Sequence, residues 1–279
     1  MTAPDKRLFA FRADLAEDSL RGRIDAARFT TGIPSRVISP MASVKREPRP
    51  DAMQLTQALH GEDVTVFEDV NGWSWIKLKA DGYVGYMESA ALAPAAEPLT
   101  HEVAVPSSLC YRAPDLKTQP VRAMPLLSRF AMTAEVNGYR VAANGDALYA
   151  RHLRPLGSGT GDFVAVAEQF LRVPYLWGGK SVAGIDCSGL VQLSLLATGG
   201  TAPRDSDMQE EGLGQSLKPQ EKLRRGDLVF WPGHVGIMAD GENLLHANAH
   251  HMMVVIEPLA AVTARSEAAG KPVSRTKRL

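Results

Sequence analysis

The sequence predicts an α+β protein in which two small β-barrels precede a domain of helices and strands. Residues 34–158 contain two copies of one pattern, offset by 66 positions, in which short β-branched strands alternate with Pro-containing loops and Gly-aromatic pairs. Short strands joined by turns are typical of small barrels. A glycine-rich segment over 157–161 follows the second copy. Beyond it, apolar residues at helical spacing give way to short apolar runs, which predicts helices followed by strands.

The chain has 279 residues, and its 31 Lys and Arg balance 31 Asp and Glu. A formal charge of zero argues against a polyanionic partner, so neither nucleic acid nor a membrane surface is expected. Two cysteines, Cys110 and Cys187, are too few for a disulfide-built scaffold. The amino terminus lacks the apolar run of a signal peptide, and no segment has the ~18 apolar residues of a membrane helix. We therefore expect a cytoplasmic protein, and the sequence specifies no oligomeric state.

The expected organisation has four parts. They are a lead-in over 1–33, a first barrel over 34–98, a more degenerate second barrel over 99–158, and a domain of helices and strands over 159–279. The lead-in is expected to be irregular or briefly helical. The basic tail over 275–279 is expected to be a solvated end.

The first barrel contains three predicted strands. They cover 64–67, 73–78 and 83–87, and Asp81-Gly82 forms the hairpin turn before the third. Trp73 and Trp75 are expected in the core of this barrel. Cys110 occupies an apolar position of the second copy and is expected to be buried there.

Two helices are predicted after the glycine-rich segment. Residues 163–171 place apolar side chains at helical spacing, with Ser158 or Thr160 as the N-cap. Residues 187–197 form the second helix. Cys187 lies in its first turn, where free N–H groups and the helix dipole favour a thiolate and lower the pKa from ~8.5. By position alone, Cys187 is either a nucleophile or a buried, inert cysteine.

Two histidines favour the first interpretation. Residues 228–239 predict a hairpin with Pro232-Gly233 at its turn, and His234 opens the second strand. His246 lies on the next strand. Histidines on neighbouring strands can lie close together, and a helix packed on the same surface would bring Cys187 to them. That is the arrangement of nucleophile, base and orienting partner in a cysteine hydrolase.

The combined motifs resemble those of NlpC/P60 cysteine peptidases over about 160–260. Tyr-x-Trp-Gly-Gly, Asp-Cys-Ser-Gly-Leu-Val, Arg-Gly-Asp-Leu-Val-Phe and Gly-His-Val-Gly-Ile stand in the family's order, and Leu-His-Ala follows. The resemblance implies a papain-like domain in which Cys187 is the nucleophile, His234 the general base and His246 its orienting partner. It also implies that Tyr175 lies beside the cysteine, near the oxyanion site. No metal or other cofactor is expected.

The first barrel resembles bacterial SH3 (SH3b) domains, in which Gly-Trp precedes Asp-Gly-Tyr-x-Gly-aromatic. Two SH3b-like modules before an NlpC/P60 domain resemble the γ-D-glutamyl-L-diamino acid endopeptidases of the dipeptidyl-peptidase VI type. The resemblance implies cleavage of murein peptides between γ-D-Glu and the diamino acid, after an L-Ala with a free amine. Such a substrate suggests a role in murein-peptide recycling.

This resemblance also implies residues that contact the substrate. Asp186 and Ser188, which flank Cys187, are expected to receive the ammonium group. Ser206 is expected at a substrate contact, and Arg204 at the α-carboxylate of D-Glu. By loop position, Glu47 and Tyr83 of the first barrel are expected to close one end of the cleft, although an exposed loop charge and a barrel-core aromatic explain them equally well.

Three other functions are considered. The histidines at 234, 246, 250 and 251 could hold Zn²⁺ together with Cys187, but neither His-Glu-x-x-His nor Cys-x-x-Cys is present. A wall-peptide binding protein with a disused catalytic domain is disfavoured, because all three catalytic positions hold competent residues. An exported wall-degrading endopeptidase or amidase would need a signal that the sequence does not show.

Overall fold

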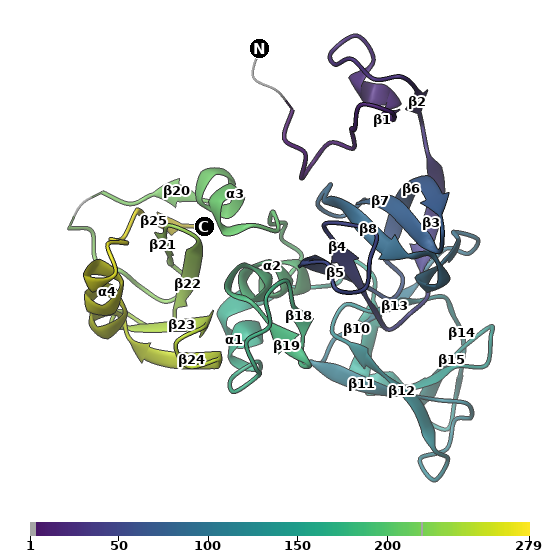
Figure 1. The fold of residues 1–279 in the computed structure, drawn as a ribbon. Coiled ribbons are helices and arrows are strands. Elements are labelled where there is room, and N and C mark those ends of the chain that lie inside the picture. Colours follow the sequence, from purple (N-terminus) through teal and green to yellow (C-terminus); the bar gives the residue numbers. More distant parts are fainter. Residues whose placement is uncertain (1–3, 219) are drawn as a thin grey trace. The chain divides into compact units, whose positions relative to one another are not determined.

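The computed structural model describes residues 4–218 and 220–279 (Figure 1). Residue contacts divide the chain into two compact units, Met1–Leu156 and Gly157–Leu279. The division lies two residues before the boundary expected from the sequence. The first three residues of the predicted lead-in lie outside the described residues.

After the lead-in, the first unit contains a barrel-like sheet of seven strands in the order β5-β4-β8-β7-β6-β3-β9. Its elements are β3 (Ile33–Val37), β4 (Met41–Lys45), β5 (Gln54–Leu59), β6 (Asp63–Val70), β7 (Trp73–Leu78), β8 (Val84–Glu88), the 3-10 helix η2 (Ser89–Ala91) and β9 (Leu92–Pro94). Alternate residues of these strands point inward, and Val44, Ile76 and Met87 are fully buried in the core. Gly82, in the predicted hairpin turn, has a φ of 77°, a conformation that favours glycine.

Two smaller sheets follow in the same unit, in the orders β13-β10-β17 and β12-β11-β16-β15-β14. Their elements are β10 (His101–Val103), β11 (Ser107–Tyr111), β12 (Pro120–Pro125), β13 (Arg129–Phe130), β14 (Met132–Val136), β15 (Tyr139–Ala142), β16 (Ala147–Tyr149), the 3-10 helix η3 (Ala150–His152) and β17 (Leu153–Pro155). Strands β4, β5 and β7 begin 66 residues before β11, β12 and β15, so the repeat seen in the sequence is a repeat of strands. Cys110 is fully buried in the core of the second copy, as expected.

The lead-in is more ordered than expected. It contains β1 (Ala16–Glu17) parallel to β2 (Phe29–Thr30), with the 3-10 helix η1 (Asp18–Leu20) between them. Ala10 and Leu15 form a separate apolar cluster with Trp75 and Val84 of the first barrel. The Arg12 guanidinium lies 4.4 Å from the Trp75 ring centroid. Trp75 is therefore buried beneath the lead-in rather than in the main barrel core where it was predicted.

The second unit is built on a six-stranded sheet in the order β20-β25-β21-β22-β23-β24. Its strands are β20 (Gln215–Ser216), β21 (Leu228–Trp231), β22 (His234–Met238), β23 (Asn243–Asn248), β24 (Met253–Pro258) and β25 (Arg275–Arg278), and a separate short pair is β18 (Lys180–Ser181) with β19 (Gly184–Ile185). Its helices are α1 (Phe163–Glu168), α2 (Cys187–Ala197), α3 (Ser206–Gly212) and α4 (Leu259–Ala268).

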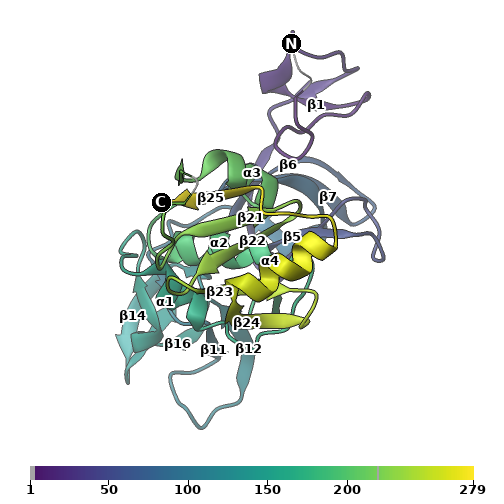
Figure 2. The same ribbon diagram turned by 90° about the vertical axis from the view of Figure 1, so that its left-hand side faces the viewer.

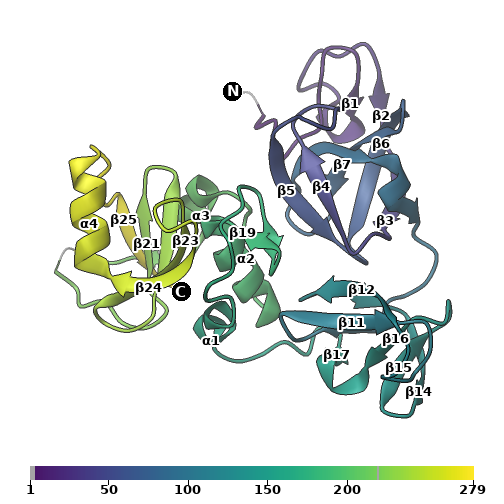
Figure 3. The same cartoon turned by 60° about the horizontal axis from the view of Figure 1, so that its bottom comes forward.

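Helices cover both faces of this sheet. Figure 3 shows α4 on one side and α1 with α2 on the other, and Figure 2 shows α4 lying across the sheet. On the α4 side, Val262 packs against Trp231 and Leu244. Among the described residues, no helix is both long and apolar enough to span a membrane. The structure thus has the predicted fold class, a β-rich SH3b-like region followed by an α+β domain.

Two local predictions in this unit were wrong. The N-cap of α1 is Asp162, whose carboxylate accepts the Val164 N–H at 2.8 Å, and neither Ser158 nor Thr160 has this position. The basic tail is not a solvated end, because β25 pairs with β20 and β21 inside the sheet. Lys277 is 3% exposed there, and its Nζ donates to the backbone oxygen of Leu213 at 2.6 Å. The tail's charges therefore belong to the folded domain.

Candidate active site

Cys187 is the first residue of α2 and is 7% exposed. The helix begins here because Asp186 has extended backbone angles and its carboxylate accepts the N–H of Gly189 at 2.7 Å. As at the start of any helix, the N–H groups of the first turn have no acceptors within the helix itself. The cysteine thus lies where the helix offers hydrogen-bond donors to a developing negative charge.

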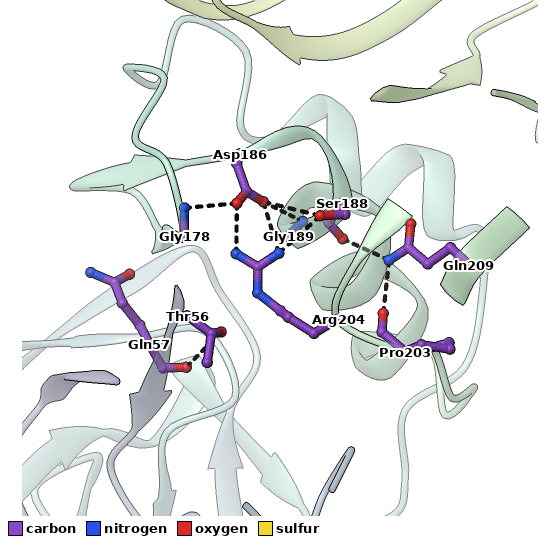
Figure 4. Close-up of polar contacts among 9 residues, drawn as sticks. All are labelled: Thr56, Gln57, Gly178, Asp186, Ser188, Gly189, Pro203, Arg204 and Gln209. Atoms are coloured by element: carbon purple, nitrogen blue, oxygen red, sulfur yellow. Dashed lines mark hydrogen bonds and ion pairs between the residues drawn. The ribbon is translucent and has the colours of Figure 1, made fainter. Parts of the chain in front are cut away.

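The Asp186 carboxylate is the centre of a buried polar network (Figure 4). Arg204, 1% exposed, donates from Nη1 and Nη2 to its two oxygens at 3.0 and 2.7 Å. The same Nη1 lies 2.9 Å from the Ser188 hydroxyl. The N–H of Gly178 reaches the second oxygen at 2.8 Å. This bidentate pair fixes the start of α2 and the Tyr-x-Trp-Gly-Gly loop together.

Glycine is required where this loop meets the helix. A Cβ atom on Gly189 would lie 2.4 Å from the backbone oxygen of Gly179 and 2.8 Å from the Asp186 carboxylate. A Cβ atom on Gly179 would in turn lie 2.4 Å from the backbone oxygen of Gly184. The glycines of both motifs therefore serve close packing around the aspartate.

The predicted lowering of the Cys187 pKa was wrong. Burial, together with the negative charge of Asp186, raises the pKa of the thiol to about 12. Hydrogen bonds from the backbone N–H groups of Val235 and Ser188 lower the pKa, but by less than burial raises it. Cys187 is therefore a neutral thiol at neutral pH.

The structure brings the two predicted histidines together. Nε2 of His234, the first residue of β22, lies 2.8 Å from Nδ1 of His246 on β23. The backbone N–H of Val235, the residue after His234, donates a hydrogen bond to the Cys187 sulfur. The start of β22 therefore lies next to the start of α2. Burial, and then the neighbouring His246, lower the pKa of His234 to about 3. The ring is thus neutral at physiological pH and can accept a proton.

Tyr175 and Ser206 also lie in this unit, both half-buried. Burial, and then the charges of Cys187 and Asp186, raise the pKa of Tyr175, so its hydroxyl stays protonated beside the cysteine. Ser206 begins α3, which is tied to α2 because Gln209 Nε2 donates to the backbone oxygen of Ser188 at 2.9 Å. Gln209 was missed in the sequence, where it stands in no recognised motif.

The geometry does not support the expected contact between Arg204 and a substrate carboxylate. Both Nη atoms are engaged by Asp186 and Ser188, and the side chain is buried. Arg204 instead holds in place the residues on either side of Cys187. Asp186, whose oxygens accept from Arg204, Gly178 and Gly189, serves first as the N-cap and as the partner of this arginine.

The two residues predicted from the first barrel differ in exposure. Tyr83 is 3% exposed and belongs to the barrel core, so the barrel itself accounts for its ring. Glu47 lies in the exposed loop after β4, and its carboxylate accepts from Arg49 Nε at 2.9 Å. Its part in substrate binding stays a prediction.

The geometry does not favour the alternative of a zinc site. Within the described ranges, no group of three His, Cys, Asp or Glu side chains could hold a metal ion. The ring nitrogens of His234 and His246 point at each other at hydrogen-bond distance, so the pair is arranged for proton transfer.

The resting state of Cys187 gives a testable pH dependence. The rate of alkylation by iodoacetamide is expected to rise about tenfold per pH unit between pH 7 and 9, because only the thiolate reacts and its fraction grows in that proportion below the pKa. Peptide mapping distinguishes this cysteine from Cys110, whose pKa burial raises to about 11. An alkylation rate that is constant between pH 6 and 8 would contradict a neutral thiol.

A cysteine at a helix start, a histidine pair on an adjoining antiparallel sheet and helices on both sheet faces define a papain-like cysteine peptidase. Residues 172–268 match the NlpC/P60 family, and residues 44–92 match the bacterial dipeptidyl-peptidase SH3 domain. The protein is therefore a cysteine peptidase in which an NlpC/P60 domain follows a bacterial SH3 domain along the chain.

Several characterised proteins and one solved structure are similar to this chain. A γ-D-glutamyl-L-lysine dipeptidyl-peptidase of Bacillus subtilis is 28% identical over 217 residues, which are 69% of this chain and 71% of that protein. Dipeptidyl-peptidase 6 of Lysinibacillus sphaericus is 38% identical over 85 residues, 30% of this chain and 31% of that protein. The crystal structure of an NlpC/P60 family protein from Bacillus cereus has a TM-score of 0.75 at 21% identity, covering 88% of this chain and 99% of that one. This last similarity supports the fold.

Proposed function

We propose that the protein hydrolyses the amide bond between the γ-carboxyl of D-Glu and the α-amine of a diamino acid, in murein peptides that begin with a free L-Ala. The observation that carries the proposal is a buried cysteine at the start of α2 beside the His234–His246 pair. The names of the Bacillus subtilis and Lysinibacillus sphaericus relatives support this choice of bond.

The proposed reaction is acyl transfer through a thioester. Nδ1 of His234 takes the Cys187 proton as Sγ attacks the γ-carbonyl carbon. The C–N bond then breaks, and the imidazolium returns that proton to the departing amine. Water, deprotonated by the same nitrogen, hydrolyses the thioester to a γ-carboxylic acid and regenerates the thiol. The Cys187 N–H and the Tyr175 hydroxyl are the donors proposed for the tetrahedral oxyanion.

The proposed recognition of the amine uses Ser188 with Asp186 behind it. A serine hydroxyl has two acceptor lone pairs, and Arg204 occupies one of them at 2.9 Å. The second lone pair can accept from an ammonium, while the Asp186 carboxylate supplies negative charge nearby. Ser206, at the start of α3, is proposed as a further contact.

Acetylation of the substrate amine tests this proposal. L-Ala-γ-D-Glu-L-Lys, and its analogue ending in meso-diaminopimelate, are incubated with the protein beside the same peptides with acetylated alanine. We expect kcat/KM to fall at least about 100-fold on acetylation, because the modification removes a charged hydrogen-bond donor from its acceptors. Mass spectrometry of the products gives both rates. Equal cleavage of free and acetylated peptides would rule out amine recognition.

We further propose that the reaction serves recycling of released peptides in the cytoplasm. In intact murein the L-Ala amine is bonded to the glycan, so an amide hydrolysis must free it before this enzyme acts. Fractionation of the source cells, followed by detection of the protein with an antibody, tests the location. Recovery of the protein outside the cytoplasmic fraction would contradict this part of the proposal.

A further inference from the structure

A carboxylate that belongs to none of the recognised motifs lies behind His246. Glu257 stands on β24, and its Oε1 lies 2.9 Å from Nε2 of His246. Nδ1 of the same ring faces Nε2 of His234 at 2.8 Å. The contacts therefore run from Glu257 through His246 to His234.

The far end of this chain of contacts is anchored on α4. Arg265 donates from Nη2 to Glu257 Oε1 at 2.7 Å and from Nη1 to Oε2 at 3.1 Å. His251 places Nε2 at 3.4 Å from the same Oε1. Burial alone would raise the pKa of Glu257, but the hydrogen bonds from Arg265 and His246 lower it to about 2. The carboxylate is thus ionised at neutral pH.

Two neighbours of His246 favour different protonation states of its Nε2 atom. Glu257 is an acceptor only, so it requires a proton on this nitrogen. Asn248 places its amide nitrogen 3.0 Å away, and its Oδ1 is engaged by the His251 N–H at 2.8 Å. The amide therefore offers a donor, which requires an unprotonated Nε2. The charge-assisted bond to the carboxylate is the stronger of the two, so Nε2 carries the proton.

This choice determines whether Nδ1 of His234, the ring nitrogen not engaged by His246, carries a proton. With the proton on Nε2, Nδ1 of a neutral His246 is an acceptor, and it takes the Nε2–H of His234. Nδ1 of His234 is then left as a lone pair for the Cys187 proton. With the opposite tautomer of His246, each ring would turn its N–H the other way, and His234 would present N–H to the thiol.

We propose that Glu257, held by Arg265, is a positioning residue that sets the tautomer of His246 and thereby the basic nitrogen of His234. The inference rests on the catalytic roles proposed for Cys187, His234 and His246. It adds a carboxylate to the pair of histidines and connects α4 to the reaction.

The central test replaces Glu257 with methionine, which has a similar length and no strong acceptor. We expect His246 to change to the Nδ1–H tautomer with Nε2 accepting from Asn248, and kcat to fall about 100-fold or more, as expected for a base held in the wrong tautomer. KM should change less than about twofold, because Glu257 does not reach the substrate. Imidazole ¹⁵N chemical shifts report the tautomer directly, and the chain has only seven histidines to assign.

A second variant separates positioning from folding. The double variant Glu257→Met/Asn248→Asp has a new carboxylate on the other side of Nε2. It should restore the Nε2–H tautomer of His246 and raise kcat at least about tenfold above that of Glu257→Met. Glu267→Met, on the exposed face of α4, is the matched control and should match the parent protein.

The outcomes distinguish the inference from the proposed function. Parent-like kcat and an unchanged tautomer in Glu257→Met would overturn the positioning role alone. A loss of kcat with an unchanged tautomer, or without recovery in the double variant, would overturn it as well. Activity retained by Cys187→Ala in the same assay would instead overturn the catalytic assignment on which it rests.

Discussion

Replacement of Cys187 by alanine is expected to lower kcat by at least about 10⁴-fold on any peptide that the parent protein cleaves. In the proposed reaction the thiol supplies the electron pair that forms the acyl intermediate. Without it, only substrate binding and oxyanion stabilisation would remain. Product formation measured by mass spectrometry over hours detects such a reduction.

Cys110→Ala is the matched control for this variant. Cys110 is fully buried in the second barrel copy, so its truncation removes the same atom from a site of no proposed chemistry. We expect activity within about twofold of the parent and a stability cost of about 1 kcal/mol from the small cavity. Full activity in Cys187→Ala would refute the assigned nucleophile.

Asp186→Asn is expected to destabilise the second unit by about 3–5 kcal/mol, because it leaves the buried Arg204 charge without its partner. Asparagine can still serve as the N-cap of α2, whose first residue is Cys187, so the expected loss comes from the ion pair with Arg204. Urea unfolding of the full chain measures the loss, and hydrogen exchange of the α2 amides assigns it to this helix.

Two further variants make this expectation specific. Asp162→Asn keeps an N-cap oxygen on α1 and removes only the charge of an exposed ion pair with Arg225, so it should cost no more than about 1 kcal/mol. Asp186→Asn combined with Arg204→Met removes both charges and should recover part of the stability. If the double variant were no more stable than Asp186→Asn, an unpaired buried charge would not be the cause.

Much of the fold and of the reacting centre could be predicted because the relevant signals are local. The repeat of strands follows from turn residues and alternating apolar positions, which repeat at the same spacing in both copies. The hairpin that presents His234 follows from Pro232-Gly233, where the glycine has a φ of 78°. The cysteine and histidines, together with their motifs, then indicate the groups that are proposed to react.

The remaining features depend on contacts between distant segments. Arg204 is 18 residues from Asp186, and nothing near it in the sequence indicates that its guanidinium is buried against that carboxylate. Glu257 is on the strand after His246, where a lone glutamate normally indicates a solvated edge. The tail resembles a solvated end because it is basic, although Arg278 forms a bidentate pair with Asp227.

The protonation state of Cys187 also could not be predicted from its position at the start of a helix. A helix N-terminus does stabilise a thiolate, and the N–H groups that do so are present. Their effect is smaller than that of burial, whose extent depends on how the whole domain packs around the sulfur. In the proposed mechanism, deprotonation of Cys187 therefore belongs to the reaction step, with His234 as the proposed base.

The position of the cut tests the central claim most directly. L-Ala-γ-D-Glu-L-Lys is incubated with the parent protein in H₂¹⁸O, and the products are identified by mass spectrometry. We predict equal amounts of free lysine and the dipeptide L-Ala-D-Glu, with one ¹⁸O in the γ-carboxylate of D-Glu. Cleavage between L-Ala and D-Glu, or no cleavage of this peptide or its meso-diaminopimelate analogue, would contradict the proposed activity.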